Sequence, residues 1–295
     1  MNASHHRKPG ASALKIIALT AIAMLAFAAN SLLARVALLM PSADAIGFTG
    51  VRLATGAIAL AAILAIQVSR SDVKNFAING SWSNASALFG YAITFSFAYV
   101  LLGAAMGALI LFGSVQLSML FWAIYKGERL IALEWFGLGI ALMAFLYLVS
   151  PGLTAPHPAG TALMVVSGIS WAFYTLLGRG SRSPLADTAG NFIRCLPIAA
   201  VLVIVALAQS SLDWRTTMLA TASGALASGG GYALWYTLLP HISRTRAAVV
   251  QLTVPPIAAL GAVIILGEPF TLRLLLATLG VLGGVALAVA APQKH

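Results

Sequence analysis

Amide, phenol and indole side chains interrupt several long apolar runs of this sequence. A polar group in the middle of such a run is costly in lipid, so it marks either a binding site or a contact between helices. Hydrogen bonds and ring stacking from such groups suit a small amphipathic ligand. The alternative is packing between helices or, for the rings, an aromatic belt at the membrane surface. The candidates for a substrate site are Asn30, Tyr91, Tyr99, Gln116, Trp171, Tyr174, Tyr232, Trp235 and Gln251.

Charged side chains near the ends of the runs form a second candidate group. Gly-Glu steps follow two runs, at Gly127-Glu128 and Gly267-Glu268, and arginines lie near other run ends. An ion pair between such residues would close one side of a transport pathway in one state. The alternative, which the sequence favours, is that each glutamate stabilises the N-terminus of the helix that follows it. The gate candidates are Arg35, Arg52, Glu128, Arg179, Arg194 and Glu268.

All 7 acidic residues lie at or near the ends of apolar runs. Proton-coupled carriers usually place an ionisable carboxylate on the pathway, so this pattern favours a facilitated carrier, or coupling through a group at a helix end. The sequence lacks His-x-x-x-His, Gly-x-Ser-x-Gly and phosphate-binding-loop patterns, and its single cysteine, Cys195, excludes an internal disulfide. We therefore expect no metal, no cofactor and no enzymatic activity. An intramembrane enzyme and a channel are the alternatives from other functional classes.

The composition is that of a membrane protein. Hydrophobic residues make up 60% of the chain and charged residues 8%, whereas roughly a quarter of the residues in soluble domains are charged. The net charge of +10 comes from basic residues scattered singly and in pairs between apolar runs. This scatter is typical of positive-inside loops and not of a nucleic-acid surface. We expect an all-α polytopic membrane protein, surrounded by lipid, with no nucleic-acid partner.

Ten apolar runs approach the length of about 20 residues that spans a bilayer core. The run Ile16–Leu39 is too long for the core of a signal peptide and is interpreted as a retained first helix. Turn residues such as Pro151-Gly152 separate the runs. The expected helices are Lys15–Leu39, Ala45–Val68, Ser83–Leu102, Gly107–Tyr125, Leu130–Val149, Gly160–Gly178, Thr188–Ala208, Thr216–Leu239, Ala247–Leu266 and Thr271–Ala290.

The ten runs divide into two matching halves. The segment Phe27–Arg35 resembles Trp171–Arg179, and Arg52 near the start of one run matches Arg194 near the start of another. Most basic residues fall in the cytoplasm if both termini lie there. Because each half has an odd number of helices, the second half then runs opposite to the first. The expected regions are a cytoplasmic tail at 1–14, repeats at 15–150 and 159–290 joined by a linker at 151–158, and a cytoplasmic tail at 291–295.

These features resemble the ten-helix EamA-type branch of the drug/metabolite transporter superfamily, over about residues 15–290. They are the duplication, the aromatic–small–polar run ending in arginine, the Gly-Glu steps and Pro255-Pro256. Gln116 stands where the second half has Pro256, so the halves are not identical copies. Among branch members, exporters of amino acids, including aromatic ones, are most similar. The resemblance implies a cavity lined by the first, third, fourth, sixth, eighth and ninth helices.

The residues and the resemblance together predict a secondary transporter that exports amino acids, including apolar and aromatic ones, through the cell inner membrane. An inverted repeat places the site near the bilayer midplane and works by alternating access. The expected partner is a small amphipathic metabolite, uniport is favoured over carboxylate-based proton antiport, and the oligomeric state stays open. A broad drug or organic-cation exporter is the alternative, and import is open because direction depends on gradients.

Overall fold

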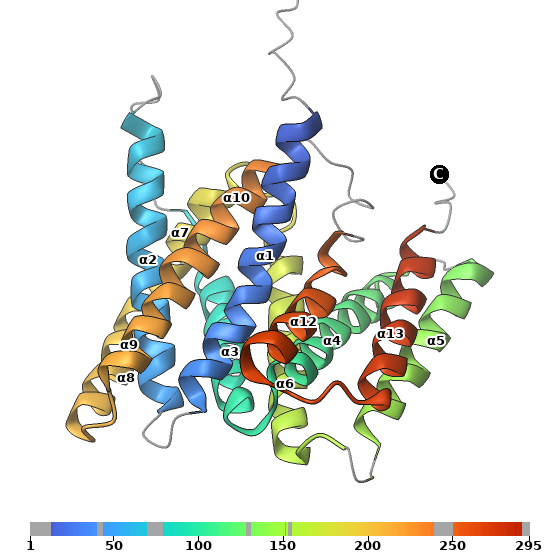
Figure 1. The fold of residues 1–295 in the computed structure, drawn as a ribbon. Coiled ribbons are helices and arrows are strands. Elements are labelled where there is room, and N and C mark those ends of the chain that lie inside the picture. Colours follow the sequence, from blue (N-terminus) through green and yellow to red (C-terminus); the bar gives the residue numbers. More distant parts are fainter. Residues whose placement is uncertain are drawn as a thin grey trace, which may run out of the picture.

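The computed structural model describes residues 13–39, 44–69, 79–127, 131–150, 152, 155–238 and 250–290. Every regular element in these ranges is a helix, and the helices pack side by side in a bundle (Figure 1). The all-α prediction is therefore confirmed for the described part of the chain. Most of the two predicted tails lies outside it.

The first six predicted runs form six long helices with ends close to the predicted ones. Each is long and apolar enough to cross a membrane, as the hydropathy of the sequence predicts. The helices are α1 (Ala13–Leu38), α2 (Ala45–Ser69), α3 (Trp82–Leu101), α4 (Ala104–Tyr125), α5 (Ala132–Val149) and α6 (Pro158–Leu177).

The seventh run bends in its middle, where the sequence places Pro197. Helix α7 (Pro184–Arg194) and helix α8 (Leu196–Ala208) meet at Cys195 with a bend of 42°. Proline has no N–H to continue the helical ladder, so it sits in the first turn of the new helix, α8. The two helices together are apolar enough to form one bent span.

The eighth run widens into a π-helix where its residues are small. It consists of α9 (Trp214–Thr221), the π-helical η1 (Ala222–Gly230) and α10 (Gly231–Leu238). The sequence of η1 is ASGALASGG, and glycine tolerates the altered backbone while small side chains leave room for close neighbours.

The last two runs form α12 (Val254–Leu266) and α13 (Leu272–Ala290). A turn at Leu252-Thr253 interrupts the ninth run immediately before the prolines. Pro255 and Pro256 then fall in the first turn of α12, where a missing N–H removes no intrahelical hydrogen bond. The prolines therefore begin a helix and do not interrupt one.

Two helix pairs lie on opposite sides of a central group. Helix α13 packs along α5, and α2 packs along α8 and η1 (Figure 1). Between these pairs, α6 packs against α3 and α4, while α1 packs against α10, η1 and α12. The central group brings α1, α3, α4, α6, η1 and α10 to one place, which is where the candidate site lies.

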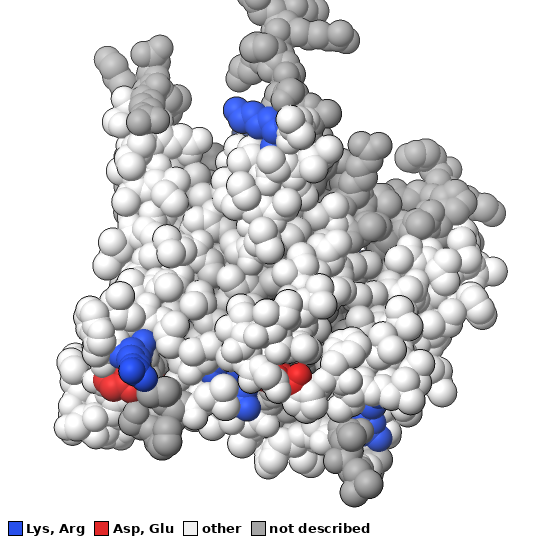
Figure 2. Space-filling view, in the orientation of Figure 1, with Lys and Arg blue, Asp and Glu red and all other residues white. Residues whose placement is uncertain are grey.

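Charged side chains avoid the middle of the molecule. Figure 2 shows a broad uncharged band across the middle of this face, with lysine, arginine and acidic side chains toward its edges. Large apolar side chains such as Ile58, Phe136, Ile204 and Ile264 are more than 60% exposed. Exposed apolar surface of this extent requires lipid, because water would penalise it. The described chain is thus a multi-pass membrane protein.

Small residues hold α5 against α13. A Cβ atom on Gly137 would lie 2.5 Å from the carbonyl oxygen of Gly284, and one on Gly284 would lie 2.5 Å from the carbonyl oxygen of Gly137. The two backbones touch at this point, which is the usual way that helices associate in membranes.

Replacing Gly137 with leucine should therefore separate α5 from α13. We expect Gly137→Leu to lower the free energy of unfolding by about 1–3 kcal/mol, the usual cost of overpacking. Gly139→Leu is the matched control, since a Cβ at Gly139 meets nothing within 4 Å. Titration with SDS in detergent micelles measures both. Equal stability of the two variants would contradict the close contact.

Candidate functional site

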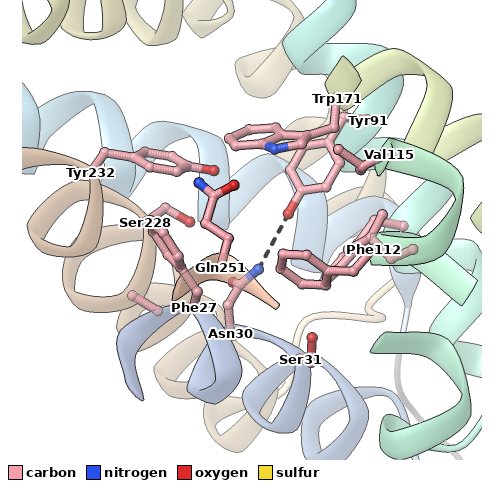
Figure 3. Close-up of a pocket in the computed structure, with 13 residues that line it drawn as sticks. Phe27, Asn30, Ser31, Tyr91, Phe112, Val115, Trp171, Ser228, Tyr232 and Gln251 are labelled. Atoms are coloured by element: carbon pink, nitrogen blue, oxygen red, sulfur yellow. Dashed lines mark hydrogen bonds between the residues drawn. The ribbon is translucent and has the colours of Figure 1, made fainter. Parts of the chain in front are cut away.

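A cavity lies where the central helices meet, and aromatic and polar side chains form its walls (Figure 3). The volume of this cavity is about 40 Å³. Five of the predicted substrate-site residues line it: Asn30, Tyr91, Trp171, Tyr232 and Gln251. The remaining wall is Phe27, Ser31, Phe95, Leu111, Phe112, Val115, Ala227 and Ser228.

Stacked rings form one wall. The indole of Trp171, on α6, stacks on Tyr232 from α10, with ring centroids 5.3 Å apart, and on Tyr174, 5.2 Å away. Tyr91 from α3 lies tilted against the same indole at 4.8 Å. Trp171 thus joins three helices and presents its ring to the cavity (Figure 3). Such a surface suits an aromatic or apolar group.

A chain of hydrogen bonds runs through Tyr91 and Asn30, two polar residues that line the cavity. Arg52 Nη2 donates to the Tyr91 hydroxyl oxygen at 3.0 Å, and Asn30 Nδ2 donates to the same oxygen at 3.4 Å (Figure 3). The Ser223 hydroxyl donates to Asn30 Oδ1 at 2.6 Å. This chain links α2, α3, α1 and η1. It orients the amide of Asn30, because both of its ends are engaged.

Four predicted substrate-site residues do not line the cavity. Tyr99 is fully buried beneath Phe95, and Tyr174 lies behind Trp171 with its hydroxyl bonded to Thr188. Trp235 is buried and packs edge-on against Phe27. Gln116 is half-buried on α4, next to the cavity residue Val115. The structure therefore places Tyr99, Tyr174 and Trp235 one layer away from the cavity, each packed on a lining residue.

Sequence reasoning missed several residues of the wall, although helical spacing points to them. Phe27 lies one turn before Asn30 and Ser31, and Phe95 lies one turn after Tyr91. Residues three or four apart share a helix face, so the neighbours of the predicted polar residues face the same cavity. The Ser228 hydroxyl lies in η1, whose altered winding no periodicity rule predicts.

A polar cluster closes the bundle near the α3–α4 turn. Arg35 Nε lies 3.5 Å from Glu268 Oε1, and Arg35 Nη1 donates to the Tyr99 carbonyl at 2.8 Å. Glu268 accepts hydrogen bonds from the backbone N–H groups of Ala104 at 2.8 Å and Ala105 at 3.3 Å. We call Arg35, Tyr99, Ala104, Ala105 and Glu268 the closing cluster.

Glu268 corrects one expectation from the sequence. It stabilises the N-terminus of α4, not that of α13, which follows it. Gly267 takes the left-handed conformation, with φ of 64°, and directs the chain toward α4. Gly103 leaves room for the carboxylate there, since a Cβ would lie 2.7 Å from Glu268 Oε2. The hydroxyl of Thr271 instead accepts from Leu274 N at the start of α13.

The other gate candidates lie apart from the closing cluster. Arg52 is buried beside the cavity. Arg194 donates to the carbonyls of Asn79 at 2.6 Å and Gly190 at 3.0 Å. Arg179 is exposed after the end of α6. Glu128 lies outside the described residues.

A double-mutant cycle tests the closing cluster. We expect Arg35→Gln and Glu268→Gln each to lower the free energy of unfolding. The double variant should lose about 0.5–3 kcal/mol less unfolding free energy than the two single variants lose together, because the two side chains contact each other. SDS titration of the four proteins measures the coupling. Additive losses of unfolding free energy would show that the contact between Arg35 and Glu268 does not stabilise the protein.

Comparison with known proteins identifies the chain. An uncharacterised protein of Pseudomonas aeruginosa is 48% identical over 276 residues, covering 94% of this chain and 95% of that protein. A probable amino-acid metabolite efflux pump of Escherichia coli is 24% identical over 208 residues, or 62% of this chain and 70% of that protein. The inner membrane transporter YedA of Escherichia coli is 31% identical over 122 residues, 41% of this chain and 39% of that protein.

A solved crystal structure shares the fold, with a TM-score of 0.61 at 19% identity, over 92% of this chain and 98% of that one. Residues 158–290 match the model of the EamA-like transporter family. This match covers the second predicted repeat, and the Pseudomonas relative extends the similarity over almost the whole chain. The chain belongs to the EamA-like transporter family, within the drug/metabolite transporter superfamily.

Proposed function

We infer that this chain exports amino acids, including aromatic and apolar ones, across the bacterial inner membrane. The observation that carries the proposal is the cavity, which combines a wall of stacked rings with a chain of polar groups. In an amphipathic amino acid, the side chain suits the rings and the backbone amine and carboxylate suit the polar groups. Similarity to an amino-acid metabolite efflux pump and to an inner membrane transporter supports the substrate class and the location.

An inverted repeat agrees with the way the helices pair. Helix α1 packs against α10 and α12 as α6 packs against α3 and α4, and the pairs α2 with α8 and α5 with α13 join equivalent helices of the two halves. In Figure 1, α1 and α6 run in opposite directions, and so do α5 and α13. Residues 15–150 and 159–290 are the two repeats, and both chain ends lie in the cytoplasm.

The size of the cavity and its closed end support alternating access. The cavity volume of about 40 Å³ is far below the roughly 300–1,000 Å³ of ligand pockets, so the walls must part to admit an aromatic amino acid. The closing cluster lies on the side that this topology assigns to the periplasm. Its opening would release substrate outward. No acidic residue lines the cavity in the described part of the chain, which favours uniport over carboxylate-based proton antiport.

Transport by purified protein in liposomes tests the function. We expect uptake of labelled phenylalanine in the absence of a pH gradient. Trp171→Ala should lower this uptake by about ten-fold, the equivalent of 1.4 kcal/mol of lost stacking. Trp214→Ala is the matched control, because that indole is 74% exposed and remote from the cavity. Movement of an organic cation without phenylalanine would contradict amino-acid export.

Thiol labelling tests the gate. In a Cys195→Ala background, Ser31→Cys places a reactive thiol in the cavity wall. An impermeant reagent added from the periplasmic side should react slowly, and Glu268→Gln should raise the rate several-fold by weakening the closing cluster. Glu134→Gln is the control, since Glu134 accepts from Ile131 N at the start of its own helix. An unchanged rate in Glu268→Gln would exclude the cluster as a gate.

A further inference from the structure

We propose that Arg52, acting through the Tyr91 hydroxyl, recognises a carboxylate on the substrate. The cavity then selects carboxylic acids and amino acids over amines that lack a carboxylate. This inference deepens the proposed transport function and rests on it for the role of the cavity. It goes further by naming the chemical group selected and the residues that select it.

The first observation is a buried positive charge that forms no ion pair with the residues described in the structure. Arg52 is 2% exposed and lies about two turns inside α2. The ion pair found among the described residues is formed by Arg35 and Glu268, and Arg52 takes no part in it. A guanidinium stays charged in proteins, and a buried charge is expensive unless it is paired. The site is therefore built to receive an anion.

Aromatic rings hold the guanidinium without neutralising it. Its carbon lies 4.7 Å from the ring centre of Phe95 and 5.2 Å from that of Tyr91. Ring faces attract a cation, which explains how the charge is tolerated in the empty state. Both rings also line the cavity, so the charge lies directly behind the wall.

The second observation is a set of unused donors. Arg52 Nη1 is buried and has no hydrogen-bond partner among the described residues. The Tyr91 oxygen accepts from both Arg52 Nη2 and Asn30 Nδ2. Its two lone pairs are thus engaged, and its own hydrogen is free for an acceptor in the cavity. A carboxylate is the acceptor that a guanidinium-linked hydroxyl binds best.

Packing fixes Arg52 at this position. Helix η1 approaches α2 so closely that a Cβ on Gly224 would collide with the Arg52 carbonyl. Helix α7 packs equally closely on α2, since a Cβ on Gly56 would lie 2.7 Å from the Phe192 ring. The far side of the cavity offers the Ser228 hydroxyl, which has no partner in the described structure, and the Gln251 amide. Those neutral groups and the stacked rings are available to the rest of the substrate. An amine without a carboxylate can use the same groups, but it gains nothing from Arg52 and is repelled by its charge.

Competition against labelled phenylalanine tests this selectivity with the unaltered protein in liposomes. The competitors are 3-phenylpropanoate, which lacks the amine, and phenethylamine and phenylalanine amide, which lack the carboxylate. We expect 3-phenylpropanoate to inhibit at a concentration about ten-fold or more below that of either amine, since hydrogen bonds to charged groups are among the strongest. Equal or stronger inhibition by the amines would overturn the proposal.

Thermal unfolding of the purified protein distinguishes failure of the proposed transport function from failure of the carboxylate site. If phenylalanine is not transported, the proposed function fails, but ligand binding still tests the inference. Stabilisation by 3-phenylpropanoate and not by phenethylamine, at equal ionic strength, would support the carboxylate site. Stabilisation by the amine alone, or by neither, would contradict it.

Substitutions then assign the selectivity to residues. Arg52→Gln should bring the ratio of acid to amine inhibition close to one, while Arg52→Lys should keep part of the preference because it keeps the charge. Tyr91→Phe retains the ring but removes the hydroxyl, and should reduce the ratio several-fold. Arg215→Gln, which removes an exposed arginine at the start of α9, is the control. A ratio unchanged by both Arg52→Gln and Tyr91→Phe would overturn the assignment.

Discussion

The contact between Glu268 and the N-terminus of α4 connects two segments of this protein that lie 164 residues apart in the sequence. One carboxylate accepts from the N–H groups of Ala104 and Ala105 and meets the guanidinium of Arg35. A helix N-terminus carries partial positive charge and N–H groups without intrahelical partners, so the carboxylate satisfies both at once. Because Gly267 and Gly103 allow the two turns to approach, a few residues join α1, α3, α4 and the α12–α13 connection. The cavity lies behind this contact.

Two arginines near that end of the bundle have different surroundings. Arg35 meets a protein carboxylate and a backbone carbonyl, and it holds the end closed. Arg52 lies deeper, against the rings of Tyr91 and Phe95, and its Nη1 has no partner in the part of the chain that the structure describes. An unpaired charge is costly within the membrane. The protein itself supplies the anion that pairs with Arg35, whereas in our proposal the substrate supplies the anion for Arg52. In our account, closure and substrate recognition therefore use separate charges, so a change in one leaves the other in place.

The sequence predicted most helices because hydropathy and helix length depend on local composition alone. It also predicted that Asn30, Tyr91, Trp171, Tyr232 and Gln251 carry polar or aromatic groups at mid-helix depth, and these line the cavity. It did not separate them from Tyr99, Tyr174 and Trp235, which lie one layer back, because that depends on the rotation of packed helices. The prediction that Glu268 stabilises the helix after it was also wrong. The carboxylate instead contacts Ala104, which is remote in sequence and is reached only through the turn at Gly267. The π-helix at Ala222–Gly230 shifts the later faces by a fraction of a turn that periodicity does not predict.

The distance between the two turns at the closed end tests the central claim most directly. Spin labels at Leu101, before the α3–α4 turn, and at Phe270, between α12 and α13, occupy exposed positions on either side of the closing cluster. In a Cys195→Ala background, double electron–electron resonance should show one short distance for the protein alone. Addition of phenylalanine should produce a second, longer population, and Glu268→Gln should enlarge it. A single distance that neither substrate nor substitution changes would contradict a gate at this end.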